Sequence, residues 1–459
     1  MNALILSAIW GVVMMFSGIF TKSGAAIRGI AITGLALLLV VNVLDFQGTA
    51  LVDINTRGML VYNTFSYMFL NIVFGATLLY FFLSGSDMER VGLHLAEYFA
   101  LIFFILAGIS IVASFQTLLM LFLGIEIISI PLYILTGSDK RNLKSNEAAL
   151  KYFLMGSFST GLMLMGIALI YGSKGSFSLE TIGAGTGVIT PLLGGGMLLL
   201  LASMSFKVSA APFHFWTPDV YDGAPTVFTS FMATIVKVAG FFAFIRLFET
   251  SFGSVQAQWQ LFAAIITAAT LLIGNITAVF QQSVKRMLAY SSIAQAGFMM
   301  FALVSLNGKG SEGLIYYAAA YSLATIGVFA VLIKLNDYTF EGFNGLGKSH
   351  PLLAATVTIC LLSLAGIPAT AGFMAKFYML SAAVENGKVI WLVILGVLCA
   401  AISVYYYFRV IQAIYFKDGE PQVAEVSTTF KVVMVLIAVL VVYFGIFPQR
   451  LTDFLYMVY

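Results

Sequence analysis

Four charged side chains stand in the middle of long apolar stretches: Glu126, Lys207, Lys237 and Lys376. A charge at the centre of a lipid bilayer costs about 2.5–3.5 kcal/mol even on the mildest insertion scale, so it is retained where it faces protein or water. Burial favours the neutral form of a lysine and a nearby carboxylate favours the charged form, so movement of the carboxylate can switch the proton. These residue types predict proton transfer, against the alternative of an ion network that only fixes helix packing.

Prolines and glycines interrupt the chain close to three of these charges. Glu126 comes five residues before Pro131, and Lys207 comes five residues before Pro212. Because proline frees the backbone carbonyl four residues earlier, we expect a polar or hydrated pocket beside each charge. The stretch "LAGIPATAGFMAK", which ends on Lys376, predicts a second broken helix.

The same residues suggest a route for the proton. Glu126 is the one carboxylate predicted in mid-span, which makes it the expected partner of Lys207. Lys237 and Lys376 are the residues expected to take up the proton next. His214 is a candidate bridge between Lys207 and Lys237 because a neutral imidazole donates and accepts, although an interfacial role suits its place at a helix end equally well. Polar groups in spans more often join helices, but five of them could hold water between the lysines: Ser291, Ser292, Gln295, Tyr316 and Tyr317.

The composition shows which elements must position these groups. Of the 459 residues, 61% are hydrophobic and 9% are charged, whereas soluble domains carry roughly 25% charged residues. The lipid bilayer must therefore be the solvent for most of this chain. The net charge of +3 is spread out, and without a basic run or a soluble domain we expect no nucleic-acid binding.

Motifs for cofactors are missing from the sequence. Cys360 and Cys399 lie in apolar stretches and are expected to be free core residues rather than a disulfide. There is no CxxC pair, histidine cluster or glycine-rich dinucleotide motif, so we expect no metal and no redox cofactor in this chain. The first segment lacks the basic region and cleavage site of a signal peptide, and we expect it to be the first span.

About 20 apolar residues are needed to cross the hydrocarbon, and by this rule the sequence predicts an all-α membrane protein with about fourteen spans. Interruptions in helices 7 and 12 predict two inverted five-helix repeats, helices 4–8 and 9–13. The expected parts are an N-terminal three-helix segment (1–93), two repeats (94–248 and 258–416) and a C-terminal helix segment (417–459). The predicted spans, in order, are 2–20, 26–44, 59–82, 94–112, 114–136, 147–171, 188–216, 225–248, 258–281, 288–305, 312–336, 351–383, 389–416 and 429–447.

Basic residues in the loops predict the orientation, because Lys and Arg stay on the cytoplasmic side. One set of loops holds nine of them and the opposite set four, which places both termini outside the cytoplasm. The loop after helix 7 departs from the rule because it carries Asp219 and Asp222. The nine are Lys22, Arg90, Lys140, Arg141, Lys144, Lys285, Arg286, Lys348 and Lys417, and the four are Arg57, Lys174, Lys309 and Lys388.

Three stretches carry a family resemblance. "FKVSAAPFHFWTPDVYDGAPTVFTSFMATIVKVAGF" resembles a signature of the proton-translocating subunits of complex I and of the related Mrp-type cation/proton antiporters. "KRMLAYSSIAQAGFMM" and "LAGIPATAGFMAKFYML" resemble two further stretches of that family. The resemblance covers helices 4–13 and puts the family's key residues on Glu126, Lys207, Lys237 and Lys376. The lysine on helix 12 and the end after fourteen helices resemble one branch of the family. A histidine that some relatives have between the helix 8 and helix 12 sites is absent.

The resemblance implies a multi-pass subunit in the bacterial inner (plasma) membrane that pumps protons as part of an NADH:quinone oxidoreductase. Other membrane subunits of complex I would be its partners, and NADH, FMN, iron–sulfur clusters and quinone would bind to partner subunits. The alternative is a subunit of an Mrp-type antiporter or of a membrane-bound hydrogenase relative. A solute transporter should show a wider and more varied polar cavity, and a structural scaffold would not need four buried charges.

Overall fold

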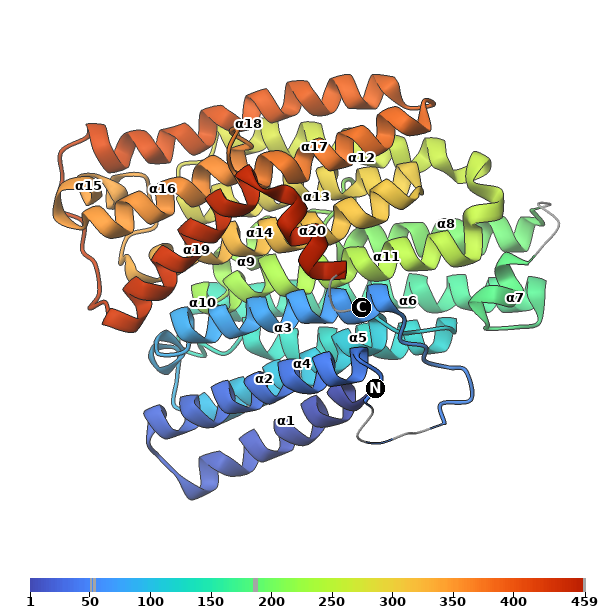
Figure 1. Ribbon diagram of the computed structural model, residues 1–459, viewed down its shortest axis with the longest axis horizontal. Helices are drawn as coiled ribbons and strands as arrows, with labels where there is room; N and C mark the ends of the chain where they lie inside the picture. The colour runs from blue at the N-terminus through green and yellow to red at the C-terminus, as the bar shows by residue number, and fades with distance from the viewer. Residues whose placement is uncertain (50–51, 53–54, 185–188, 457–459) are drawn as a thin grey trace.

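The computed structural model describes residues 1–49, 52, 55–184 and 189–456 as a bundle of long helices that lie side by side (Figure 1). Within these residues there is no strand, and the extended backbone makes only isolated β-bridges. The prediction of an all-α polytopic protein is confirmed. Cys360 and Cys399 are both buried and free.

The uninterrupted helices follow the predicted spans to within a few residues. Several begin at a polar side chain that accepts a hydrogen bond from the first turn, as Asn63, Thr117 and Ser283 do. The eleven helices are α1 (Asn2–Phe20), α2 (Gly24–Phe46), α3 (Thr64–Ser84), α4 (Leu95–Val112), α5 (Leu118–Thr136), α6 (Leu143–Lys174), α12 (Gln256–Val279), α13 (Val284–Ser305), α14 (Gly308–Lys334), α18 (Ile390–Phe416) and α19 (Thr428–Ile446).

Three further spans are irregular, and two of them are broken at the predicted interruptions. The first comprises α8 (Pro191–Lys207) and α9 (Trp216–Gly223), so it extends beyond residue 216, where predicted helix 7 was expected to end. Predicted helix 12 consists of α16 (Pro351–Ala365) and α17 (Ala371–Asn386). The third is continuous but contains a wide π turn, an irregularity often found at functional sites. It comprises α10 (Thr226–Phe231), the π turn η2 (Met232–Val236) and α11 (Lys237–Phe252).

Five short elements lie in the connections between spans, and a sixth, α20, follows the last span and crosses the side of the bundle (Figure 1). They are η1 (Asp87–Arg90), α7 (Leu179–Gly183), η3 (Gly253–Val255), η4 (Glu341–Phe343), α15 (Leu346–Ser349) and α20 (Pro448–Tyr456). We refer to the two ends of the bundle as the α15 end and the α7 end. In Figure 1, α15 lies at the left and α7 at the right.

The number of spans agrees with the sequence. Among the described residues, eleven helical stretches are long and apolar enough to cross a membrane. One of them, Thr226–Val279, has 54 residues, which at 1.5 Å per residue would measure about 80 Å. It is divided at η3 and therefore forms two spans. With the two broken helices, whose halves are shorter, the count reaches the predicted fourteen.

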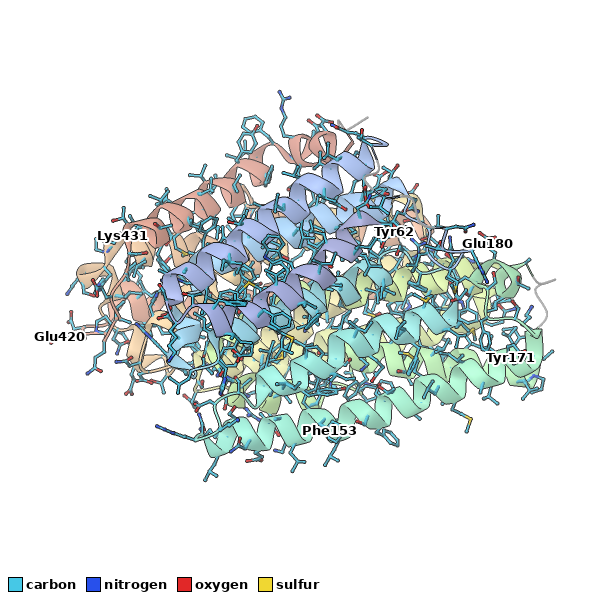
Figure 2. All side chains as sticks on the ribbon, turned by 90° about the horizontal axis from the view of Figure 1, so that it is seen from below. Tyr62, Phe153, Tyr171, Glu180, Glu420 and Lys431 are labelled. Atoms are coloured by element: carbon cyan, nitrogen blue, oxygen red, sulfur yellow. The ribbon has the colours of Figure 1, made fainter. Side chains whose placement is uncertain are left out.

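The surface of the bundle suits a bilayer. Large apolar side chains such as Phe153 and Phe158 are more than half exposed on α6, and Figure 2 shows Phe153 on the outer edge of that helix. Glu420 and Lys431 lie at one end of the bundle and Glu180 at the other (Figure 2). Apolar sides between charged ends are what a membrane-spanning protein requires.

The two broken helices run in opposite directions. The first follows α7 and the second follows α15, at the opposite end of the bundle (Figure 1). Between them, α13 and α14 are buried along almost their whole length. Opposite directions are what an inverted repeat requires, and the division into repeats stays a prediction.

Candidate functional site

Lys207 is the last residue of α8, where the first broken helix is interrupted. The chain turns there through Ser209, which has a positive φ of 65°, and then reaches Pro212. The Lys207 Nζ donates to the Ser129 Oγ on α5 at 3.0 Å. Both side chains line a cavity of about 30 Å³, which is large enough for water. The other lining residues are mostly apolar, and a hydrated pocket beside Lys207 stays a prediction.

Glu126 lies on α5 one helical turn before Ser129, so the two side chains share a face of the helix. Its Oε1 accepts a hydrogen bond from the Thr160 Oγ1 on α6 at 2.8 Å. Glu126 is near enough to act electrostatically on Lys207, but no ion pair joins them among those of the described residues. Lys207 binds Ser129 and Glu126 binds Thr160, and the predicted Glu126–Lys207 switch stays a prediction.

Lys237 is the first residue after the π turn and its side chain is 2% exposed. Its Nζ donates to the backbone oxygen of Ser292 at 2.9 Å and to the Ser292 Oγ at 2.8 Å. The ammonium also lies 5.7 Å from the centre of the Tyr221 ring. Helices α9, α11 and α13 therefore meet around this one nitrogen.

Lys376 lies on α17 but binds the other half of its broken helix. Its Nζ donates to the backbone oxygens of Leu364 (3.0 Å) and Ala365 (2.9 Å), which end α16. The ammonium also lies 4.8 Å from the centre of the Phe298 ring. The last carbonyls of a helix have no partner within it and carry partial negative charge, so they stabilise the protonated lysine.

Gly366 allows this close approach at the second break. Its φ of +83° is a conformation that glycine adopts without strain. A Cβ at this position would lie 3.0 Å from the Cδ of Lys376 and 3.2 Å from its Nζ. The glycine of the predicted break thus lets the lysine reach the end of α16.

Three of the five predicted water-holding residues lie between Lys237 and Lys376. Ser292 binds Lys237, as described above. Gln295 donates from its Nε2 to the backbone oxygen of Leu364 at 2.9 Å, the same oxygen that binds Lys376. Tyr317 on α14 donates to the Oε1 of Gln295. The two lysines are thus linked to one face of α13.

Two other predicted residues are placed elsewhere. Tyr316 donates to the backbone oxygen of Phe444 at 2.7 Å and lines a cavity of about 490 Å³ with Lys309. Neighbouring residues on a helix point about 100° apart, so Tyr316 and Tyr317 cannot both face α13. His214 is buried in the first break, and no hydrogen bond among those of the described residues joins its ring to Lys207 or Lys237.

Sequence reasoning missed Tyr407 on α18. Its hydroxyl lies 2.5 Å from the Oγ of Ser291 and accepts from the Nε2 of Gln295 at 3.2 Å. Ser291, the fifth predicted water-holding residue, is therefore joined to Gln295 through Tyr407. Three consecutive tyrosines, Tyr405 to Tyr407, were a signal in the sequence. The helical phase that points one of them inward is visible only in the structure.

Further buried charges lie at the α15 end, around a cavity of about 510 Å³. Lys285 was counted as a loop residue, but it lies in the first turn of α13, 3% exposed, and donates to the backbone oxygens of Asp222 (2.8 Å) and Ala224 (2.6 Å). Lys334 forms a buried ion pair with Asp87 at 2.6 Å. Within the described residues, no group of three or more His, Cys, Asp or Glu side chains could hold a metal ion.

Asp219 and Asp222 were expected in a loop, but both lie on α9 and are paired with basic side chains of neighbouring helices. Asp219 accepts from Lys151 on α6 and from Arg286 on α13, each at 2.9 Å. These ion pairs tie the second half of the broken helix to α6 and α13. These partners offset the two acidic residues that departed from the loop-charge rule.

Comparison with known proteins identifies the family. The model of the family described as "NADH:quinone oxidoreductase/Mrp antiporter, TM" matches residues 115–403. A protein from Cytophaga hutchinsonii named NADH-quinone oxidoreductase subunit N is 41% identical over 98% of this chain and 98% of its own length. The chain belongs to this NADH:quinone oxidoreductase/Mrp antiporter family.

Solved structures of the family have the same fold. A chain of respiratory complex I from Thermus thermophilus is 31% identical, with a TM-score of 0.84 over 97% of each chain. A chain of the Mrp complex from a Dietzia species, at 17% identity, shares the fold with a TM-score of 0.84 over 99% of this chain and 96% of its own. The resemblance seen in the three sequence stretches is confirmed, and the similar proteins include several named subunit N.

Proposed function

We propose that this chain translocates protons as a membrane subunit of a bacterial respiratory NADH:quinone oxidoreductase. The observation that carries the proposal is the set of partners of three lysines inside the bundle. Lys207, Lys237 and Lys376 donate to hydroxyls and backbone carbonyls, and among the described residues none has a carboxylate in contact. A structural ion network would pair each charge, because an uncompensated buried charge costs several kcal/mol. Uncharged partners suit a lysine that is protonated for only part of a cycle.

The proton would pass along the line of lysines. Each transfer turns one ammonium into an amine and the next amine into an ammonium, so the number of charges inside the bundle is conserved. Glu126 favours the protonated form of Lys207 electrostatically, and Ser129 holds that lysine when the carboxylate is at a distance. Moving or neutralising Glu126 would release the proton toward Lys237, and Lys376 would deliver it onward.

Electron transfer would take place elsewhere in the complex. The relatives named subunit N and the matching chain of complex I support this assignment. NADH, FMN, iron–sulfur clusters and quinone would bind to partner subunits, and this chain would contribute no redox group. The excess of basic residues toward one side, eight against four once the buried Lys285 is left out, favours a plasma-membrane orientation with both termini outside the cytoplasm.

The shared family model and fold also favour a second candidate, a cation/proton antiporter subunit of the Mrp type. Purification of the tagged chain in mild detergent, followed by identification of the co-purifying proteins, separates the two. We expect subunits that carry flavin and iron–sulfur clusters, and NADH-driven proton uptake by vesicles that contain the complex. Recovery of small membrane subunits alone, with sodium-dependent proton exchange and no NADH oxidation, would overturn the proposal in favour of the antiporter.

A further inference from the structure

We propose that Tyr321 is a positioning residue for Lys237, because its hydroxyl holds the π turn that directs the lysine toward Ser292. This rests on the proposed function, since it concerns a lysine of the same path. Tyr321 lies on α14 and is 3% exposed. Its hydroxyl donates to the backbone oxygen of Ala233, inside the π turn, at 2.7 Å.

The hydroxyl of Tyr321 takes the place of a donor that the π turn removes. In a regular α-helix the Ala233 oxygen would accept from the backbone N–H of Lys237, four residues later. In this structure that N–H donates to the backbone oxygen of Thr234 instead. An unpaired carbonyl inside a membrane bundle is costly, so the phenol stabilises the π turn at this position.

The π turn decides where Lys237 points. A π turn holds one more residue than a turn of α-helix, and an added residue rotates the side chains that follow it by about 100°. Lys237 is the first residue after the turn, and its Nζ donates to both oxygens of Ser292 on α13. A π turn that moved along the helix would therefore turn Lys237 away from Ser292.

The hydrogen bond of Tyr321 ties the π turn to a different helix. The other side-chain hydroxyl bonded within the turn is that of Thr234, which donates to the backbone oxygen of Ser230 at 2.6 Å. This second bond stays within one helix and would move with it. The bond from Tyr321 comes from α14, so it holds the turn against an external point.

Helix α14 is a suitable support because it is also bonded to α13. Tyr317, one turn before Tyr321, donates to Gln295 on α13. Residues four apart share a face of a helix. One face of α14 therefore holds both the helix that carries Ser292 and the turn that precedes Lys237, and so sets the position of the lysine relative to its partner.

Tyr80 provides a matched control. It is fully buried on α3, and its hydroxyl donates to the backbone oxygen of Val227 at 3.0 Å. Val227 lies on α10, in the regular part of the same span. Tyr80→Phe keeps the ring contact with Phe231 and, like Tyr321→Phe, removes one buried hydrogen bond from a phenol to this span. A general loss of stability affects both variants, whereas a misplaced Lys237 follows only from Tyr321→Phe.

The test uses the whole complex in membrane vesicles and measures assembled complex, thermal midpoint and proton uptake at matched NADH oxidation. We expect both Phe variants to assemble, with similarly lowered thermal midpoints. Only Tyr321→Phe should lower proton uptake, by about tenfold, because a small displacement of a reacting group costs up to about 10²-fold. Equal uptake by the two variants, or loss of assembled complex in Tyr321→Phe alone, would overturn the positioning role.

A double variant shows whether Tyr321 acts through the contact between Lys237 and Ser292. Ser292→Ala removes one of the two oxygens that bind the lysine and should lower proton uptake by itself. If Tyr321 acts through this contact, the double variant Tyr321→Phe/Ser292→Ala should pump as well as Tyr321→Phe alone. Losses that multiply, as independent defects do, would overturn the proposal, and so would unchanged uptake in Ser292→Ala.

Lys237→Met in the same assay separates failure of this role from failure of the proposed function. If Lys237→Met lowers proton uptake and Tyr321→Phe does not, only the role of Tyr321 is refuted. Normal uptake in Lys237→Met would refute the proposed path itself, and the role of Tyr321 with it.

Discussion

The two broken helices hold their lysines in different ways. Lys207 ends the first half of its helix and reaches across to Ser129 on α5, with Glu126 one turn away. Lys376 belongs to the second half of its helix and reaches back to the carbonyls of Leu364 and Ala365. The first lysine is thus bound by side chains of another helix, and the second by backbone of its own.

Because of this difference, the protonation of Lys207 and that of Lys376 are controlled in different ways. The surroundings of Lys207 change when side chains of α5 move, and one of these is a carboxylate that can itself gain or lose a proton. The hydrogen bonds of Lys376 change when α16 and α17 move relative to each other, because the lysine bridges the break. We infer that the first site is switched by charge and the second by helix geometry.

Substitutions of Lys237 and Lys376 should have the largest effect on proton uptake. Lys→Met at positions 237 and 376 removes the group that takes a proton, and Lys→Arg keeps it charged because the guanidinium does not deprotonate. We expect all four variants to assemble and to lower proton uptake by more than about tenfold. The exposed Lys388→Met is the control. If the lysines only hold helices together, both Arg variants pump normally and the Met variants lose assembled complex.

Glu126→Gln should have the next largest effect on proton uptake, and this effect should come only through Lys207. The amide keeps an acceptor for Thr160 but loses the charge that favours the protonated form of Lys207. Because the carboxylate is not in contact with the lysine, we expect normal assembly and a loss of proton uptake of a few-fold, equivalent to about 1 kcal/mol. Proton uptake in vesicles at matched NADH oxidation measures it. An unchanged uptake would remove Glu126 from the switch.

Gly366→Ala should act only through the second site. It introduces strain at a positive φ, worth about 1 kcal/mol, and pushes on Lys376. The matched control is Gly387→Ala, where φ is +72° and a Cβ would meet nothing within 4 Å. Both variants should lower the midpoint of thermal unfolding slightly, but only Gly366→Ala should reduce proton uptake. Equal pumping by the two would mean that the geometry of the second break does not control Lys376.

The smallest effect is expected at an exposed ion pair just before the second broken helix. The hydrogen bond from Lys348 holds the pKa of Asp418 below its ordinary value. A carboxyl whose pKa is lower when folded adds stability above its unfolded pKa, near pH 4, and loses it as the pH falls through the folded value. Asp418→Asn should therefore lower the thermal midpoint marginally at neutral pH. This difference should vanish in high salt and in acid, and its persistence there would contradict the assignment.

The sequence was sufficient for features that depend on local chemistry. Apolar length predicted the spans, and prolines and glycines predicted both breaks, because bilayer thickness and backbone sterics act locally. Features that depend on helical phase were out of reach. The sequence did not separate Tyr317 from Tyr316 or point to Tyr407, since rotation about the helix axis decides which neighbour faces inward. Lys285 was misplaced because its carbonyl partners come from another part of the chain.

The buried pair of Asp87 and Lys334 has a consequence for the order in which the protein is made. The two residues are separated by 247 positions. At roughly 5–20 residues per second, the ribosome delivers Lys334 about 10 to 50 s after Asp87. Until then the nearest cation to Asp87 is Arg90, which is largely exposed and 3.4 Å away. The buried ion pair at the α15 end of the first three helices is therefore completed only when α14 has been made, well after those helices.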